Sequence, residues 1–206
     1  SVECVLNRAV DSLCKLCDVR CTNLFLPFDI SGPDGANLPL AFGVLEEVSP
    51  PVKIKVIKSW MNGWATSHRM HEDEIHCCLL GCDGHSDSMS HYVGCPHLFA
   101  MMRFHFNEVS DDPLIRFGFK NPTAVNFKRI SCIFSAYHAV KEQVRSGKII
   151  LHQRNFHRNA WNVFASTVGA EAGEMCLQCR SFSFAKFMSF LTTGILPRQL
   201  AQLQDT

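Results

Sequence analysis

Hydrophobic side chains recur at helical spacing in several parts of the chain. The clearest pattern begins at Asn121, which suits an N-cap, and Pro122, which suits the first helical position, and it runs to Gly147. Its apolar face consists of Phe127, Ile130, Ile133, Phe134, Tyr137, Val140 and Val144. Shorter patterns predict an amphipathic helix over residues 5–17, a helix over residues 52–62 ended by Gly63, and helices over residues 152–168 and 181–193.

Prolines and glycines interrupt these patterns and indicate where the chain divides. Residues 26–43 are rich in both, which is typical of a loop or linker. We place a boundary near Pro50 and Pro51. The chain then has three parts: residues 1–50 with a helix and the linker, residues 51–100 with a helix followed by a segment rich in Cys and His, and residues 101–206 with further helices.

The composition is that of a folded chain and excludes several classes of protein. Hydrophobic residues make up 47% of the 206 positions and charged residues 19%, which is enough to bury a core. The net charge is only +1, but residues 51–70 carry lysine and arginine without an acid, and residues 71–90 carry acids without either. No stretch reaches the roughly 18 to 20 apolar residues of a membrane span, so we expect no membrane partner.

Eleven cysteines raise the question of disulfides. Their number is odd, no secretory signal peptide precedes them, and a chain of this size has no need of covalent staples. We therefore expect reduced thiols and an intracellular protein of the cytoplasm or nucleus, not a secreted one. Because the chain begins with Ser1, we also expect it to be a processed product or a fragment of something longer.

Two close pairs of residues predict a structural zinc site. Cys78 and Cys82 are followed after a short loop by His91 and Cys95. Zinc prefers four nitrogen or sulfur ligands in a tetrahedron, and a hairpin together with a helix start or turn can supply all four. Gly81 and Gly94 stand directly before cysteines, where a residue without a side chain lets backbone N–H groups approach sulfur. Three thiolates and one imidazole leave no open coordination position, so one structural Zn²⁺ is expected.

Other cysteines and histidines leave parts of this prediction open. Cys77 can replace Cys78, and His76, His85 or His97 can compete for a place. The competing interpretation is a chance gathering of buried thiols and surface histidines. Elsewhere, the group Cys14, Cys17 and Cys21 favours core packing, and Cys176 with Cys179 can be half of a second metal site or a redox pair. The fold class that follows is mainly α, with helices flanking a small CCHC finger and little or no β-sheet.

No catalytic centre emerges from the sequence. Asp111 and Asp112 are an adjacent acidic pair of the kind that two-metal chemistry uses, but their surroundings favour a solvated loop or helix cap. His71 and His76 are five positions apart, so they point about 140° apart on a helix and cannot share a metalloprotease zinc. We expect no activity in this chain alone and infer no small-molecule substrate.

The segment WMNGWATSHRMH at residues 60–71, followed by the Cys78 to Pro96 cluster, resembles the zinc-binding region after the polymerase domain of non-LTR (LINE-type) retrotransposon reverse transcriptases. The resemblance covers residues 54–99. It implies a module that helps a polymerase hold template RNA or target DNA, with Cys78, Cys82, His91 and Cys95 as metal ligands. Many relatives have four residues between the last His and Cys, where this chain has three.

A basic segment before the finger agrees with a nucleic-acid role. The candidate contacts are Lys53, Lys55, Lys58, Trp60, Trp64, His68 and Arg69, which combine phosphate neutralisation with aromatic faces for stacking on RNA or single-stranded DNA. The alternative is that both tryptophans belong to the core and the lysines to a solvated face. We assign Lys128, Arg129, Lys141, Arg145 and Lys148 to the solvated face of the long helix. The other expectation for the whole chain is a structural or protein-interaction zinc domain without a nucleic-acid role, of which a decayed remnant is one form.

Overall fold

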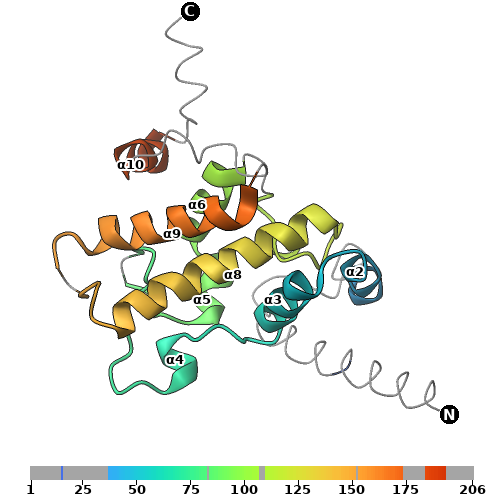
Figure 1. Ribbon diagram of the computed structural model, residues 1–206, viewed down its shortest axis with the longest axis horizontal. Helices are drawn as coiled ribbons and strands as arrows, with labels where there is room; N and C mark the ends of the chain where they lie inside the picture. Colours follow the sequence, from blue (N-terminus) through green and yellow to red (C-terminus); the bar gives the residue numbers. More distant parts are fainter. Residues whose placement is uncertain are drawn as a thin grey trace, which may run out of the picture. The chain divides into compact units, whose positions relative to one another are not determined.

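The computed structural model describes Lys15 and residues 37–82, 84–106, 110–151, 153–173 and 184–193. These residues form helices joined by loops (Figure 1). Within them the only β-structure is an isolated antiparallel bridge between Cys77 and Ser86. The mainly α fold class is therefore confirmed. The predicted helix over residues 5–17 and the two outlying cysteine groups fall outside the described residues, apart from Lys15.

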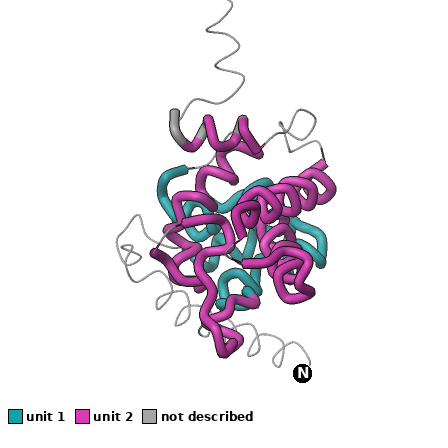
Figure 2. The backbone as a smooth tube through the Cα atoms, turned by 90° about the vertical axis from the view of Figure 1, so that its left-hand side faces the viewer, with its two compact units in different colours: residues 1–64, 110–131 teal, residues 65–109, 132–206 magenta. Residues whose placement is uncertain are grey.

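The chain divides into two compact units, shown in Figure 2: residues 1–64 with 110–131, and residues 65–109 with 132–206. Unit 1 contains α2 (Leu38–Leu45), α3 (Pro50–Trp60), α7 (Pro113–Arg116) and the first turns of α8 (Ala124–Arg145). Unit 2 contains the rest of α8 with α4 (Ser67–Met70), α5 (Met89–Gly94), α6 (Pro96–Phe106), α9 (Phe156–Ala172) and α10 (Phe184–Thr193). No helix among the described residues is both long enough and apolar enough to cross a membrane.

Helix α2 corrects the prediction that residues 26–43 form a loop, since its residues 38–43 are helical. Asn37 caps the helix by accepting a hydrogen bond from the Leu40 amide at 3.0 Å. Pro39 lies in the first turn, where the absent N–H has no helical partner to lose. Pro39, which contributed to the prediction of a loop, therefore belongs to the first turn of a helix.

Two other helix ends differ from the predicted ones. Helix α3 ends at Trp60, and Asn62, rather than Gly63, takes the left-handed backbone conformation with φ 55°. Helix α8 begins at Ala124, and the Thr123 hydroxyl accepts a hydrogen bond from the Asn126 amide at 3.1 Å. Asn121, the predicted cap, has φ 49° and lies before the helix. Short polar side chains compete for such positions, so spacing alone did not select the right one.

Trp60 is the centre of the core of unit 1. Its ring is fully buried and lies 4.9 Å from the ring of Phe119 and 5.7 Å from that of Phe127, measured between centroids. The indole N–H donates to the Phe117 carbonyl at 2.8 Å. Trp64 is also fully buried, and its N–H donates to the Ser59 hydroxyl at 3.0 Å. Both polar groups are satisfied, as burial of tryptophan requires.

The core of unit 2 is also aromatic. Trp161 of α9 stacks on Phe187 of α10 with 3.8 Å between ring centroids. His105 of α6 lies parallel to the same indole at 5.6 Å and is fully buried. Helix α10 thus packs against α6 and α9 in unit 2.

Candidate metal centre

A short hairpin carries the first two cysteines. The Cys78 amide donates to the His85 carbonyl, and the Asp87 amide donates to the His76 carbonyl, each at 2.8 Å. Within the hairpin the Gly81 amide donates to the Cys78 carbonyl at 3.1 Å, and Gly81 has φ +95°, a conformation that side chains disfavour. This turn brings Cys78 and Cys82 to one side of the hairpin. Gly81 therefore allows the turn.

A short helix carries the other two residues. Ser88 caps α5, because its hydroxyl accepts a hydrogen bond from the His91 amide at 3.3 Å. His91 lies within the helix, and Cys95 is the C-cap residue, with φ −62° and ψ 117°. The predicted combination of a hairpin with a helix or turn is what the structure shows.

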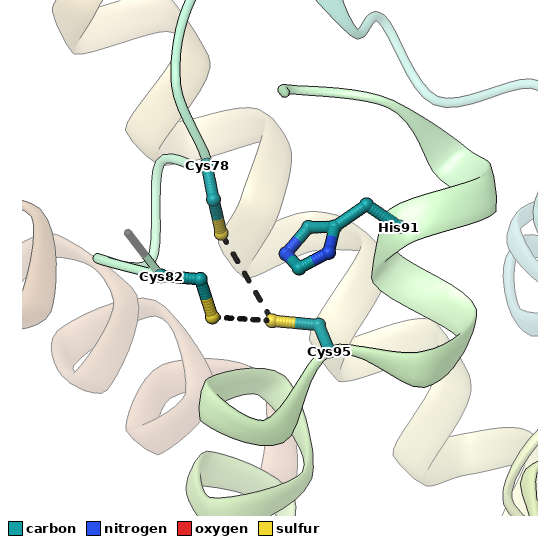
Figure 3. A group of neighbouring side chains, drawn as sticks. All are labelled: Cys78, Cys82, His91 and Cys95. Carbon is teal, nitrogen blue, oxygen red and sulfur yellow. Dashed lines mark hydrogen bonds between the residues drawn. The ribbon is translucent and has the colours of Figure 1, made fainter. Parts of the chain in front are cut away.

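The four side chains converge on a common centre, as Figure 3 shows. One ligand atom from each of Cys78, Cys82, His91 and Cys95 lies within 4.8 Å of the others. Cys95 Sγ is 3.3 Å from Cys82 Sγ and 3.9 Å from Cys78 Sγ. Zinc–sulfur bonds of about 2.3 Å in a tetrahedron place sulfurs about 3.8 Å apart, so the spacing suits a metal ion.

Burial at the centre favours a bound ion over solvent. The relative exposure of Cys78, Cys82 and Cys95 is 1%, 6% and 1%. Nε2 of His91 is buried and has no hydrogen-bond partner, and Figure 3 shows its ring directed at the sulfurs. A buried ring nitrogen without a partner is costly. Coordination of a metal ion by that nitrogen would remove the cost.

The close contacts at the centre shift the pKa of His91, Cys82 and Cys95. Burial lowers the pKa of His91, but the sulfurs of Cys78 and Cys82 outweigh burial and raise it to about 9. Hydrogen bonds from Cys78 and Cys95 lower the pKa of Cys82. Hydrogen bonds of Cys95 with Cys78 and Cys82 raise the pKa of Cys95. A cation at the centre would displace thiol protons and hold the sulfurs as thiolates.

The residues that competed for a ligand position lie around this set. Cys77 is exposed, and His85 stacks on the His91 ring with 4.5 Å between centroids. His97 donates from Nδ1 to the Leu80 carbonyl at 2.8 Å. Nε2 of His76 lies 3.2 Å from a carboxylate oxygen of Glu72. Among the described residues the converging group holds none of these four side chains.

Hydrogen bonds also hold the loop between Cys78 and Cys82, and sequence reasoning missed them. The Leu79 amide donates to the Tyr92 hydroxyl at 3.1 Å, and His97 engages Leu80 as described. On the other side of the centre, the Leu98 amide donates to Cys95 Sγ at 3.3 Å. An amide approaching sulfur was expected next to Gly81 or Gly94, whereas this donor comes from the first turn of α6.

Asp87 is a buried acceptor next to the centre. Its Oδ1 accepts hydrogen bonds from the Tyr92 and Tyr137 hydroxyls, each at 2.8 Å. Its Oδ2 accepts from the Ser67 amide at 2.7 Å and from Lys141 Nζ at 3.1 Å. The assignment of Lys141 to the solvated face of α8 was wrong, because the residue is 2% exposed. A buried carboxylate attracts an ammonium group out of water when the geometry satisfies both.

The predicted nucleic-acid residues are divided between the two units. Lys53, Lys55 and Lys58 lie on α3 in unit 1, whereas His68 and Arg69 are exposed in α4 of unit 2. Trp60 and Trp64 are 0% exposed, so the expectation that they offer faces to bases was wrong. The competing interpretation, that both belong to the core, is the correct one for the tryptophans.

The residues weighed for catalysis have structural positions. Asp112 caps α7 by accepting a hydrogen bond from the Leu114 amide at 2.8 Å, as the cap interpretation of this acidic pair predicted. His71 ends α4 with φ 50°, and His76 lies beyond that helix, so the two do not share a helical face.

In comparisons with known proteins, no family model, no curated protein and no solved structure matches this chain. What the chain does must therefore be argued from its own residues, and the buried Cys3His group is the feature that most constrains the argument.

Proposed function

We propose that the Cys3His group holds one structural Zn²⁺ ion that stabilises unit 2. The observation that carries this proposal is the convergence of four buried or half-buried donors, three sulfurs and one nitrogen, within 4.8 Å. Zinc favours this donor set in a tetrahedron, and soft thiolates disfavour Mg²⁺ and Ca²⁺. Since protein atoms fill all four positions, the ion has a structural role and no place for a substrate.

Metal analysis of the purified chain tests this proposal. We expect one equivalent of zinc, and we expect Co²⁺ to replace it with the visible spectrum of a tetrahedral thiolate complex. Cys95→Ser should lose the ion, whereas Cys77→Ser, which changes an exposed neighbour of Cys78, should keep it. Absence of zinc from protein prepared under reducing conditions, together with no uptake on titration, contradicts the proposal.

We also propose that the chain is the zinc-binding region of a retroelement-derived reverse transcriptase and contacts RNA or single-stranded DNA. Support comes from the resemblance of residues 54–99 and from the three lysines of α3, a helix without an acidic residue. Because both tryptophans are buried, the contacts are to phosphates and not to base faces. A transcript that encodes a polymerase palm ahead of Ser1 would support this origin.

Salt dependence tests the nucleic-acid proposal. Binding of a single-stranded RNA probe should weaken steeply with salt, and replacing Lys53, Lys55 and Lys58 by Gln should reduce the slope of log K against log salt by about 2. A control with Lys128, Arg145 and Lys148 replaced by Gln removes equal charge outside the predicted set. Failure of the wild-type chain to bind at low salt rules the proposal out.

A second candidate function is a zinc-stabilised protein-interaction domain. The observation that favours it is the end of α4 with the loop that follows, where Met70 and Ile75 are 49% and 56% exposed near the acidic residues Asp73 and Glu74. Exposed apolar side chains next to charge are typical of protein contacts. If the RNA probe does not bind, a fluorescent probe at position 75 that reports binding of basic peptides would test this candidate.

A further inference from the structure

Tyr92 connects the two halves of the metal centre. It belongs to α5, directly after His91, and its hydroxyl contacts the amide of Leu79 in the loop between Cys78 and Cys82. The residue is 1% exposed. We propose that Tyr92 is a positioning residue of the metal centre, held in place by Asp87, and that its hydroxyl slows release of the ion. This inference rests on the proposed binding of zinc.

The direction of the Tyr92 hydroxyl follows from its partners. The Leu79 N–H can only donate, so the tyrosine oxygen accepts at 3.1 Å. The hydroxyl proton must then point to Asp87, whose Oδ1 lies at 2.8 Å. A donor that gives its proton to a carboxylate is a better acceptor for a second partner. Asp87 thereby strengthens the hydrogen bond that holds the metal loop.

The charge of Asp87 is balanced by a residue from α8. Lys141 Nζ lies 3.1 Å from Oδ2 of Asp87 and 2.8 Å from Oε2 of Glu72. Because Oδ2 is occupied by Lys141 and the Ser67 amide, Oδ1 remains for the two tyrosines. The ion pair fixes the carboxylate, and the carboxylate in turn fixes Tyr92.

Tyr137 provides a matched comparison inside the protein. Its hydroxyl also donates to Oδ1 of Asp87 at 2.8 Å, and its ring is 0% exposed, but the hydrogen bond of the Leu79 amide goes to the Tyr92 hydroxyl. The two tyrosines pack against each other with 5.1 Å between ring centroids. Loss of either hydroxyl removes one hydrogen bond from Asp87, but only Tyr92→Phe leaves the Leu79 amide without its acceptor.

The experiment compares zinc-loaded wild type, Tyr92→Phe and Tyr137→Phe. Release of zinc into excess chromogenic chelator gives the dissociation rate, and urea titration gives the stability of each protein. Both variants should lose similar stability, whereas only Tyr92→Phe should release zinc about tenfold faster or more, in the range typical of residues that support metal ligands. The Co²⁺ spectrum of Tyr92→Phe should also differ from that of wild type.

Equal release rates for the two variants, with equal Co²⁺ spectra, overturn the inference. If Tyr92→Phe does not fold, hydrogen exchange of the Leu79 amide in the zinc-loaded wild type decides: strong protection supports the inference, and exchange at the rate of an open loop overturns it. A wild-type chain that binds no zinc is a different result, because it refutes the proposed function itself.

Discussion

Lys141 Nζ lies 3.1 Å from Oδ2 of Asp87, although the two residues are 54 positions apart in the chain. The lysine is 2% exposed and the aspartate 0%. The ammonium group also lies 2.8 Å from Glu72. One cation from α8 therefore connects Glu72, before the hairpin, with Asp87, which stands just before the N-cap of α5. This relationship makes unit 2 depend on a helix that contains no metal ligand.

Lys141→Met should destabilise the protein by about 3 to 5 kcal/mol, because it leaves the Asp87 carboxylate buried without its cation. Urea unfolding of the zinc-loaded protein measures the loss. Lys148→Met is the control, since Lys148 is exposed and should change stability by less than about 0.5 kcal/mol. The double variant Asp87→Asn with Lys141→Met should recover part of the loss. If its loss of stability equals the sum of the losses of the two single variants, the effect is not one of charge.

Removal of the metal should lower the stability of the protein. A ligand that binds only the folded state stabilises it by about 4 kcal/mol at a thousand times its dissociation constant. Thermal unfolding with and without a strong chelator measures the difference. The same chelator should have no effect on Cys95→Ser, which lacks a complete ligand set; an equal effect on both proteins would place the chelated ion elsewhere.

His105 should make stability depend on pH. Burial lowers its pKa from the ordinary value of 6.5 to about 3. Between these values the unfolded chain binds more protons than the folded one, so stability is full above pH 6.5 and falls with decreasing pH, by at most about 1.4 kcal/mol per pH unit.

His105→Phe should remove this contribution, and urea unfolding of both proteins across the same range measures it. Zinc is also released in acid, but that loss is common to both proteins and cancels in the difference. Parallel pH profiles for the two proteins would show that His105 does not titrate as its burial requires.

Gly81→Ala should weaken the metal loop. The φ of +95° is strained for any residue with a side chain, at about 1 to 3 kcal/mol, and an added Cβ would lie 2.8 Å from Nδ1 of His157. Because His157 is exposed and can turn away, the backbone strain dominates. Urea titration of Gly81→Ala, alone and combined with His157→Ala, checks this: a full rescue by His157→Ala would mean that the contact, and not the backbone, causes the loss.

Features encoded by near neighbours were predictable from the sequence. The long helix followed from apolar spacing, although Thr123 rather than Asn121 caps it. The convergence of Cys78, Cys82, His91 and Cys95 followed from two short spacings, because a hairpin and one helix bring residues at most 17 positions apart together. The identity of a metal ion bound by this group is not decided by spacing.

Features that depend on distant partners were not predictable. Lys141 and Lys148 belong to the same basic series, yet only Lys141 is buried, because Asp87 and Glu72 reach it from segments 54 and 69 positions away. The sequence around Trp60 suggested a surface for stacking on bases. In the structure Trp60 is buried in a core, where its N–H donates to the carbonyl of Phe117, 57 positions away.

By itself, the sequence determined the mainly helical class and the set of four candidate ligands, since both arise from local periodicity and spacing. The tertiary structure alone decided which polar and aromatic side chains leave water. Burial of a charge or an indole N–H is stable only when a partner meets it, and those partners come from remote parts of the chain.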